Sequence, residues 1–203
     1  TDDEYLAYLP MAWAGDAVYT LFLGLAAGFT VNCPESPETV QRDLRELGPT
    51  TMLAPPAIWE NMLTAVQVRA ADSPWLKRRV FEYFRGVAER AEILRADGAP
   101  VPPGLRMLCA LGEFFVYGPV RDQLGLGRTR WALPGGAPLG PETYRFFRAF
   151  GVNLKQVYGA TETTGLVSVQ PDAEANPTTV GRPCRGIEVK IAEKGEVLIK
   201  SAG

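Results

Sequence analysis

Short apolar, β-branched runs alternate along this chain with longer stretches in which apolar residues recur at helical spacing. The short runs predict strands at residues 5–9, 29–33, 50–54, 130–133 and 156–158. The longer stretches predict helices at residues 13–27, 36–48, 55–67, 73–95, 105–126 and 141–150. Such alternation is typical of an α/β fold with a mostly parallel sheet covered by flanking helices.

Several local signals refine these helices. Ser36 has the side chain of an N-cap residue, and Gly48 suits the position just after the helix ends. Pro119 is expected to start a new helical turn, because proline in a helix interior removes a hydrogen bond. The helix at 13–27 is nearly apolar from residue 17 but too short to span a membrane, so we expect it to be buried.

The pattern changes after Pro171. The following residues, to 186, are loop-like, and residues 187–191 and 196–200 then alternate as a hairpin does. We therefore place a boundary near Pro177, with residues 1–177 forming an α/β subdomain and 178–203 the start of a β-rich subdomain. The chain lacks an initiating methionine and ends just after a strand, which favours a fragment of a longer protein.

Composition narrows the classes of function. The chain has 203 residues, is 46% hydrophobic, and has a net charge of −2, so no bulk attraction to nucleic acid is expected. It contains no histidine, which excludes Ser-His-Asp and Cys-His catalysis and histidine-ligated metals within these residues. Its cysteines, Cys33, Cys109 and Cys184, show no CxxC spacing. With no signal peptide recognisable, the expectation is a reduced, cytoplasmic protein.

Two glycines follow the strand expected at residues 130–133. Because Gly135 and Gly136 lack a Cβ atom, a flat ligand can lie directly against their backbone. Taken alone, a tight turn between a strand and a helix explains the pair at least as well.

A second loop, YGATETTG at residues 158–165, also follows a strand. Tyr158 could stack on a base, Thr161 could donate a hydrogen bond to a phosphate oxygen, and Glu162 could hold Mg²⁺. The alternative is a capping box in which Thr161 or Thr163 caps a short helix.

Together these motifs resemble those of the AMP-forming adenylate synthetases, which include acyl-CoA synthetases, luciferases and peptide-synthetase adenylation domains. Residues 158–165 match the YGxTE motif of that family, and residues 135–139 match its GGAPL element. Three further segments resemble family elements: 8–13, 180–183 and 195–198. The sequence of residues 51–62 resembles that of the bacterial long-chain fatty-acid–CoA ligases, a branch of the family.

The resemblance implies a site for each substrate. Gly135, Gly136, Ala137 and Pro138 would flank the adenine and the acyl pocket, and Tyr158, with Gly159 and Ala160, would lie on the adenine. Thr161 would contact the α-phosphate and Glu162 would coordinate Mg²⁺; Trp13, Gly136 and Thr163 would border the substrate pocket. The implied reaction uses ATP, Mg²⁺ and CoA to convert a carboxylate into an acyl-adenylate and then a thioester.

Three motifs of that family are not found in the sequence: the phosphate-binding loop, the YxxTGD ribose-binding segment, and the mobile domain that bears a lysine. We therefore expect a central piece of the large domain, inactive by itself. Aromatic residues concentrated between 70 and 130, read with the family branch, favour a fatty or other hydrophobic carboxylate as the substrate.

Other interpretations stay open at this point. Asp16 could bind the ammonium group of an amino-acid substrate, and an aryl acid is a further alternative, although a carboxylate near a helix start also has a structural role. A non-catalytic nucleotide-binding module and an α/β interaction domain are the alternatives without turnover. A basic group on the long helix, Lys77, Arg78, Arg79 and Arg85, is read first as solvated surface, with CoA phosphate or peripheral membrane contact as the other interpretations.

Overall fold

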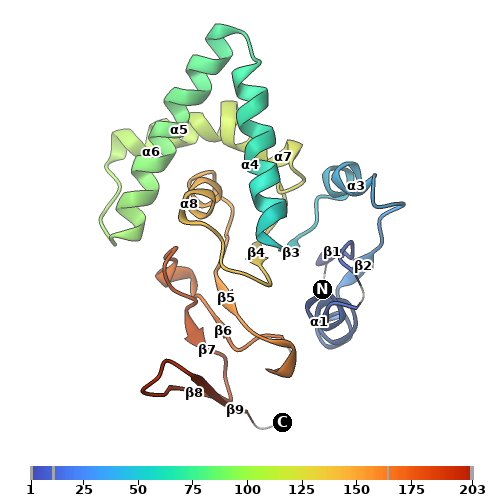
Figure 1. Ribbon diagram of the computed structural model, residues 1–203. Helices are drawn as coiled ribbons and strands as arrows, with labels where there is room; N and C mark the ends of the chain where they lie inside the picture. The colour runs from blue at the N-terminus through green and yellow to red at the C-terminus, as the bar shows by residue number, and fades with distance from the viewer. Residues whose placement is uncertain (1, 11, 164, 202–203) are drawn as a thin grey trace.

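The computed structural model describes residues 2–10, 12–163 and 165–201 (Figure 1). Its centre is a set of short parallel strands: β1 (Glu4–Leu6) pairs with β2 (Thr30–Asn32), and β3 (Thr51–Ala54) pairs with β4 (Trp131–Pro134). The Glu4 N–H donates to Thr50 Oγ1 at 2.8 Å and the Thr50 N–H donates to the Glu4 carbonyl at 3.0 Å, which joins the two pairs. A parallel bridge between Ala132 and Leu154 extends the layer.

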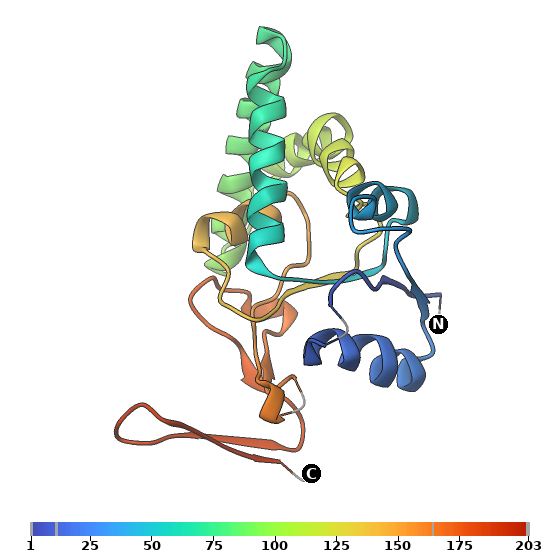
Figure 2. The same ribbon diagram turned by 45° about the vertical axis from the view of Figure 1, so that its right-hand side comes forward.

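Alternate residues of these strands enter two different cores, as the period of two along a strand requires. On one side lie Tyr5, Leu53 and Leu133. On the other lie Leu6, Met52, Ala54 and Ala132. Figure 2 shows helices beyond both faces of the layer. The predicted parallel, covered sheet is thus confirmed for this part of the chain.

The helix predicted at 13–27 forms as three continuous segments: α1 (Ala14–Ala17), the π-helical η1 (Val18–Leu23) and α2 (Gly24–Ala27). Its expected burial is wrong, because the helix covers the strands with one face only and leaves Leu21, Phe22 and Leu25 exposed. It ends where Gly28 takes a φ of +68°, a conformation that glycine adopts readily. Among the described residues, no helix is both long and apolar enough to cross a bilayer.

The remaining helices are α3 (Val40–Leu47), α4 (Pro56–Ala71), α5 (Trp75–Ala96), α6 (Pro103–Gly112), η2 (Glu113–Tyr117), α7 (Gly118–Gln123) and α8 (Pro141–Ala149). Ser36 is not an N-cap: α3 begins at Val40, because the Thr39 hydroxyl bonds the Ser36 carbonyl and the Asp43 carboxylate instead. Pro119 stands in the first turn of α7, directly after the π-helical turn η2. That wider turn leads into the proline without a break in the helical run.

The strands after α8 are antiparallel, so the fold is mixed rather than mostly parallel throughout. A small sheet contains β5 (Val157–Tyr158), β6 (Ser168–Val169) and β7 (Arg182–Pro183). The predicted hairpin is confirmed as β8 (Ile187–Ile191) paired with β9 (Val197–Ser201). Single 3₁₀ turns lie at Thr161–Thr163 and Asp172–Glu174. The domain boundary near Pro177 stays a prediction.

Candidate adenylation site

The glycine pair after β4 lies against the indole of Trp13. A Cβ atom on Gly135 would stand 2.9 Å from Trp13 Cη2 and 3.0 Å from Leu53 Cδ1, closer than side chains pack. Gly136 has a φ of +86°, and its Cβ would be 3.5 Å from Trp13 Cζ2. Both glycines are therefore required here, one for close approach and one for backbone conformation.

Beyond Gly135 the chain turns outward before it re-enters the core. Gly136, Ala137 and Pro138 are exposed, whereas Leu139 is buried. The predicted nucleotide-binding segment thus presents three small residues to solvent at the carboxyl end of a parallel strand, a position where α/β proteins commonly bind ligands.

The second loop is a tight, internally hydrogen-bonded turn. The Gly165 N–H donates to the Ala160 carbonyl at 3.0 Å, and a Cβ on Gly159 would overlap the Gly165 carbonyl oxygen. The Thr163 hydroxyl accepts from the Ala160 N–H at 3.1 Å and donates to the Ala160 carbonyl at 2.9 Å. Thr163, the last residue of the 3₁₀ turn, therefore closes the turn by bonding back to Ala160, whereas the alternative interpretation placed a threonine as its cap. Thr164 of the motif lies outside the described residues.

That turn leaves the chemically active side chains free. Tyr158 is 37% exposed, and Thr161 and Glu162 are exposed. In the part of the chain that the structure describes, the Glu162 carboxylate takes part in no hydrogen bond or ion pair. No cluster of three acidic, cysteine or histidine side chains surrounds a common point among the described residues. A single carboxylate fits Mg²⁺ that arrives with nucleotide phosphates, because such ions take few protein ligands.

A buried glutamine connects the two loops. Gln156, two residues before Tyr158, accepts from the Leu139 N–H at 3.4 Å and donates to the Leu139 carbonyl at 3.0 Å. Its own backbone N–H donates to Gln170 Oε1 at 2.8 Å, and the same oxygen accepts from the Tyr144 hydroxyl at 2.9 Å. Sequence reasoning missed both glutamines, because nothing local marks a polar residue that bonds a distant backbone.

One helix borders both loops. Trp13, at the start of α1, lies against Gly135, and Val18 of η1 lies 3.5 Å from the Cβ position of Gly165. Together with the Gln156 bonds, these contacts bring the two predicted motifs to the same edge of the parallel strands.

Comparison with known proteins supports the same interpretation. The sequence profile of the AMP-binding enzyme family matches residues 1–203. The chain belongs to the AMP-binding enzymes. It is 30% identical to the putative fatty-acid–CoA ligase fadD11 of Mycobacterium tuberculosis, over 98% of this chain and 35% of that protein. It therefore spans about a third of the length of such a relative.

Solved structures show a similar fold. A benzoate CoA ligase from Burkholderia xenovorans superposes with a TM-score of 0.59 at 20% identity, covering 97% of this chain and 30% of that one. The N-terminal domain of FACL13 from Mycobacterium tuberculosis superposes with a TM-score of 0.56 at 19% identity, covering 98% and 40%. At these identities the superpositions establish the fold.

In this AMP-binding chain, the aromatic residues between 70 and 130 do not line one pocket. Phe81 and Phe84 pack against the core, and Tyr117 is buried with its hydroxyl donating to the Phe84 carbonyl at 2.7 Å. The others are exposed on the surface: Trp75, Tyr83, Phe114 and Phe115. The aromatic concentration thus divides between core and surface.

Asp16 is buried beneath the site and already has a partner. The Tyr5 hydroxyl donates to its carboxylate at 3.1 Å, and only 1% of the residue is exposed. Burial raises the pKa of Asp16, while the Tyr5 hydrogen bond opposes that rise. A carboxylate held in this way is not directed to a substrate ammonium group.

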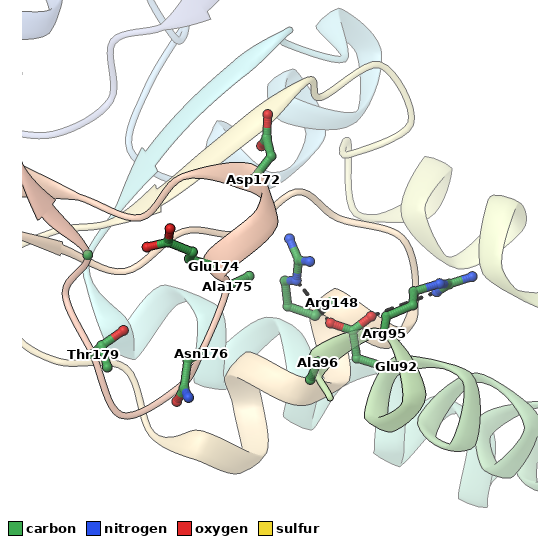
Figure 3. A pocket seen from close by; sticks show the side chains of 10 residues that line it. Glu92, Arg95, Ala96, Arg148, Asp172, Glu174, Ala175, Asn176 and Thr179 are labelled. Atoms are coloured by element: carbon green, nitrogen blue, oxygen red, sulfur yellow. Dashed lines mark hydrogen bonds and ion pairs between the residues drawn. The ribbon is translucent and has the colours of Figure 1, made fainter. Parts of the chain in front are cut away.

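The larger of the described cavities, about 540 Å³, lies elsewhere, between the end of α5 and the loop at 172–181 (Figure 3). Its central cation, Arg148, bonds Glu92 at 3.1 Å and Asn153 at 3.2 Å. At its rim Asp172 pairs with Lys155 at 2.9 Å. Because these charged side chains pair with one another, we interpret them as structural ion pairs rather than as a binding site.

Proposed function

We propose that this chain forms the central part of the adenylation site of an acyl-CoA ligase. The observation that carries the proposal is that the α1–η1 helix borders both loops, with Trp13 against Gly135 and Val18 against Gly165, while Gln156 bonds Leu139. Membership of the AMP-binding enzymes supports it, and the fatty-acid–CoA ligase names of its relatives supply the reaction class.

In the proposed complex, Gly135, Gly136, Ala137 and Pro138 flank the adenine. Tyr158, followed by Gly159 and Ala160, covers the ring, whose aromatic face stacks on a phenol. Thr161 donates a hydrogen bond to an α-phosphate oxygen. Glu162 would hold Mg²⁺, which supplies positive charge against the phosphates when it is bound.

The reaction that this arrangement serves needs no protein nucleophile. A carboxylate oxygen of the substrate attacks the α-phosphorus of ATP, and the bond to pyrophosphate breaks, which leaves an acyl-adenylate. The CoA thiol then attacks the acyl carbon and releases AMP. The residues of this chain contribute by positioning the adenylate and by hydrogen bonding its phosphate, which agrees with the absence of histidine.

For the substrate we propose a hydrophobic carboxylate, with a long-chain fatty acid as the first candidate. Trp13 presents its indole beside Gly135 and Gly136, so an apolar wall borders the site at that point. Relatives named as fatty-acid–CoA ligases favour the acyl chain. An aryl carboxylate is the second candidate, because a structure of similar fold is a benzoate CoA ligase.

The test is carboxylate-dependent exchange of pyrophosphate into ATP, measured on the full-length protein that contains this chain. Palmitate, benzoate and phenylalanine serve as the three substrates. We expect the strongest exchange with palmitate and none with phenylalanine, since Asp16 is bound to Tyr5. If none of the three carboxylates supports exchange but the protein still binds an adenylate, a non-catalytic nucleotide-binding module is favoured. We expect no exchange from these 203 residues alone.

A further inference from the structure

The tip of the α4–α5 helical hairpin carries exposed apolar side chains next to unpaired cations. Both ribbon views show the hairpin projecting away from the strands, with its turn at residues 72–74 farthest out (Figures 1 and 2). We propose that this tip, the hairpin patch of residues 75–83, binds the surface of an anionic lipid membrane. The proposal is independent of the adenylation site.

Apolar exposure at the patch is concentrated on one side of α5. Trp75 is 69% exposed, Leu76 58%, Tyr83 56% and Val80 37%. Together with Arg79 they occupy positions 75, 76, 79, 80 and 83, a spacing that places them on one face of the helix. Phe81 and Phe84, on another side of α5, pack against the core, and full burial begins at Val87 and Ala88.

Positive charge surrounds that face. Residues 69–85 carry five basic and two acidic side chains, a net charge of +3 in a chain whose total is −2. Lys77, Arg78 and Arg79 are exposed, and none pairs with a carboxylate in the described part of the chain.

Helix stability does not explain these cations. The first turns of a helix carry partial positive charge, so basic side chains there are electrostatically unfavourable. The N-cap residue, Pro74, offers no side-chain hydrogen bond to offset them. A negatively charged partner accounts for both the cations and the helix end.

A lipid surface fits this combination better than a protein partner. Tryptophan and tyrosine favour the bilayer interface, where the ring is buried among lipid and the polar edge stays hydrated, while lysine and arginine reach the headgroups. A second copy of the chain would bring two patches of net charge +2 together, which opposes self-association. Neither of the described cavities is lined by a residue of the hairpin patch.

The experiment measures binding of the purified protein to vesicles of phosphatidylcholine, with and without phosphatidylglycerol. Of the four tryptophans, Trp59 is buried, Trp13 and Trp131 are half-buried, and Trp75 is exposed. We expect anionic vesicles to shift the fluorescence to shorter wavelength, and Trp75→Phe to abolish that shift while binding persists. Added salt should weaken binding.

Matched control variants distinguish a specific effect of the hairpin patch from a general effect of removing charge or apolar surface. Neutralising Lys77, Arg78 and Arg79 to glutamine should weaken binding about a hundredfold, at about fivefold for each cation near an anionic surface. Neutralising Arg185, Lys190 and Lys194, exposed near the C-terminal hairpin, should leave it unchanged. Ile191, 70% exposed, provides the control for Trp75→Ala.

Three outcomes would overturn the proposal: no binding to anionic vesicles, equal binding to neutral vesicles, or equal loss in the control variants. An oligomer that dissociates in Trp75→Ala would instead identify the patch as a contact between copies of the chain. Glu162→Gln should leave vesicle binding unchanged, so failure of the adenylation proposal is distinguishable from failure of this one.

Discussion

The side-chain amide of Gln156 bonds both backbone groups of Leu139, accepting from the N–H at 3.4 Å and donating to the carbonyl at 3.0 Å. Leu139 ends the first glycine-containing loop, and Gln156 precedes the second by two residues. A buried side chain that satisfies two backbone groups at once fixes their relative position. The geometry of the candidate site depends on this pair.

Gln156→Leu should destabilise the protein. Leucine would leave the buried Leu139 N–H without its partner and remove the bond to the Leu139 carbonyl, at a cost of about 1–3 kcal/mol in the free energy of unfolding. Chemical denaturation measures the change. The exposed Gln123 offers the control, since Gln123→Leu should alter stability by less than about 0.5 kcal/mol. Equal stability of the two variants would remove Gln156 from this role.

Gly135→Ala should be destabilising for a different reason. The added methyl group would stand 2.9 Å from Trp13 and 3.0 Å from Leu53, so both neighbours must move, at a cost of about 1–3 kcal/mol. At Gly140 a Cβ would meet nothing within 4 Å, so Gly140→Ala is the matched control.

Combining Gly135→Ala with Trp13→Ala tests the contact itself. The double variant should lose less stability than the sum of the two single variants, because the smaller residue at 13 makes room for the methyl group. Strict additivity would show that Trp13 and Gly135 do not interact.

Asp16 should give the protein a specific pH dependence. Its pKa in the folded protein is raised above the ordinary 3.8, so the folded state binds more protons there than the unfolded state. The stability that protonation provides is complete below 3.8 and is lost as the pH rises through the raised pKa. Asp16→Asn, which keeps an oxygen for the Tyr5 hydroxyl, should become more stable relative to the original protein as the pH increases across that range.

Denaturation at a series of pH values checks this sign. Tyr5→Phe provides the second variant: without the hydrogen bond that lowers the pKa of Asp16, the loss should move to higher pH. A difference between Asp16→Asn and the original protein that does not vary with pH would contradict this account.

The elements predicted best from the sequence are those whose signals lie within their own residues. The strand at β3 and the helices α4 and α5 follow from apolar runs and proline starts, and their bounds lie close to the prediction. The predicted start of α3 at Ser36 is wrong, because the Thr39 hydroxyl forms the local hydrogen bonds before the helix. Side chains competing for one helix end cannot be ranked from spacing alone.

The antiparallel strands and the polar core were less visible in the sequence. β5 has two residues, and the connection to its partner β6 includes the Gly165 N–H bond to the Ala160 carbonyl. Gln170 is fully buried and bonds Tyr144 and the Gln156 backbone, partners 26 and 14 residues away in the chain. The motifs at 135–138 and 158–163 were recognisable because glycine conformation and free polar side chains leave a sequence pattern, whereas long-range hydrogen bonds do not.

Glu162→Gln should impair adenylation in the full-length protein. Glutamine keeps the shape but loses the charge that would hold Mg²⁺, so kcat for pyrophosphate exchange should fall about a hundredfold while the KM for the carboxylate changes little. Glu193→Gln, at an exposed position of the C-terminal hairpin, controls for loss of charge. Unchanged turnover in Glu162→Gln would exclude Glu162 from the site.

The most direct test of the account is a titration with a non-hydrolysable acyl-adenylate analogue, followed by NMR of the backbone amides. If the two loops hold one adenylate, the amide signals of residues 135–139 and 158–163 should shift together and saturate at the same ligand concentration. Shifts confined to one loop, or to the cavity around Arg148, would contradict the shared site.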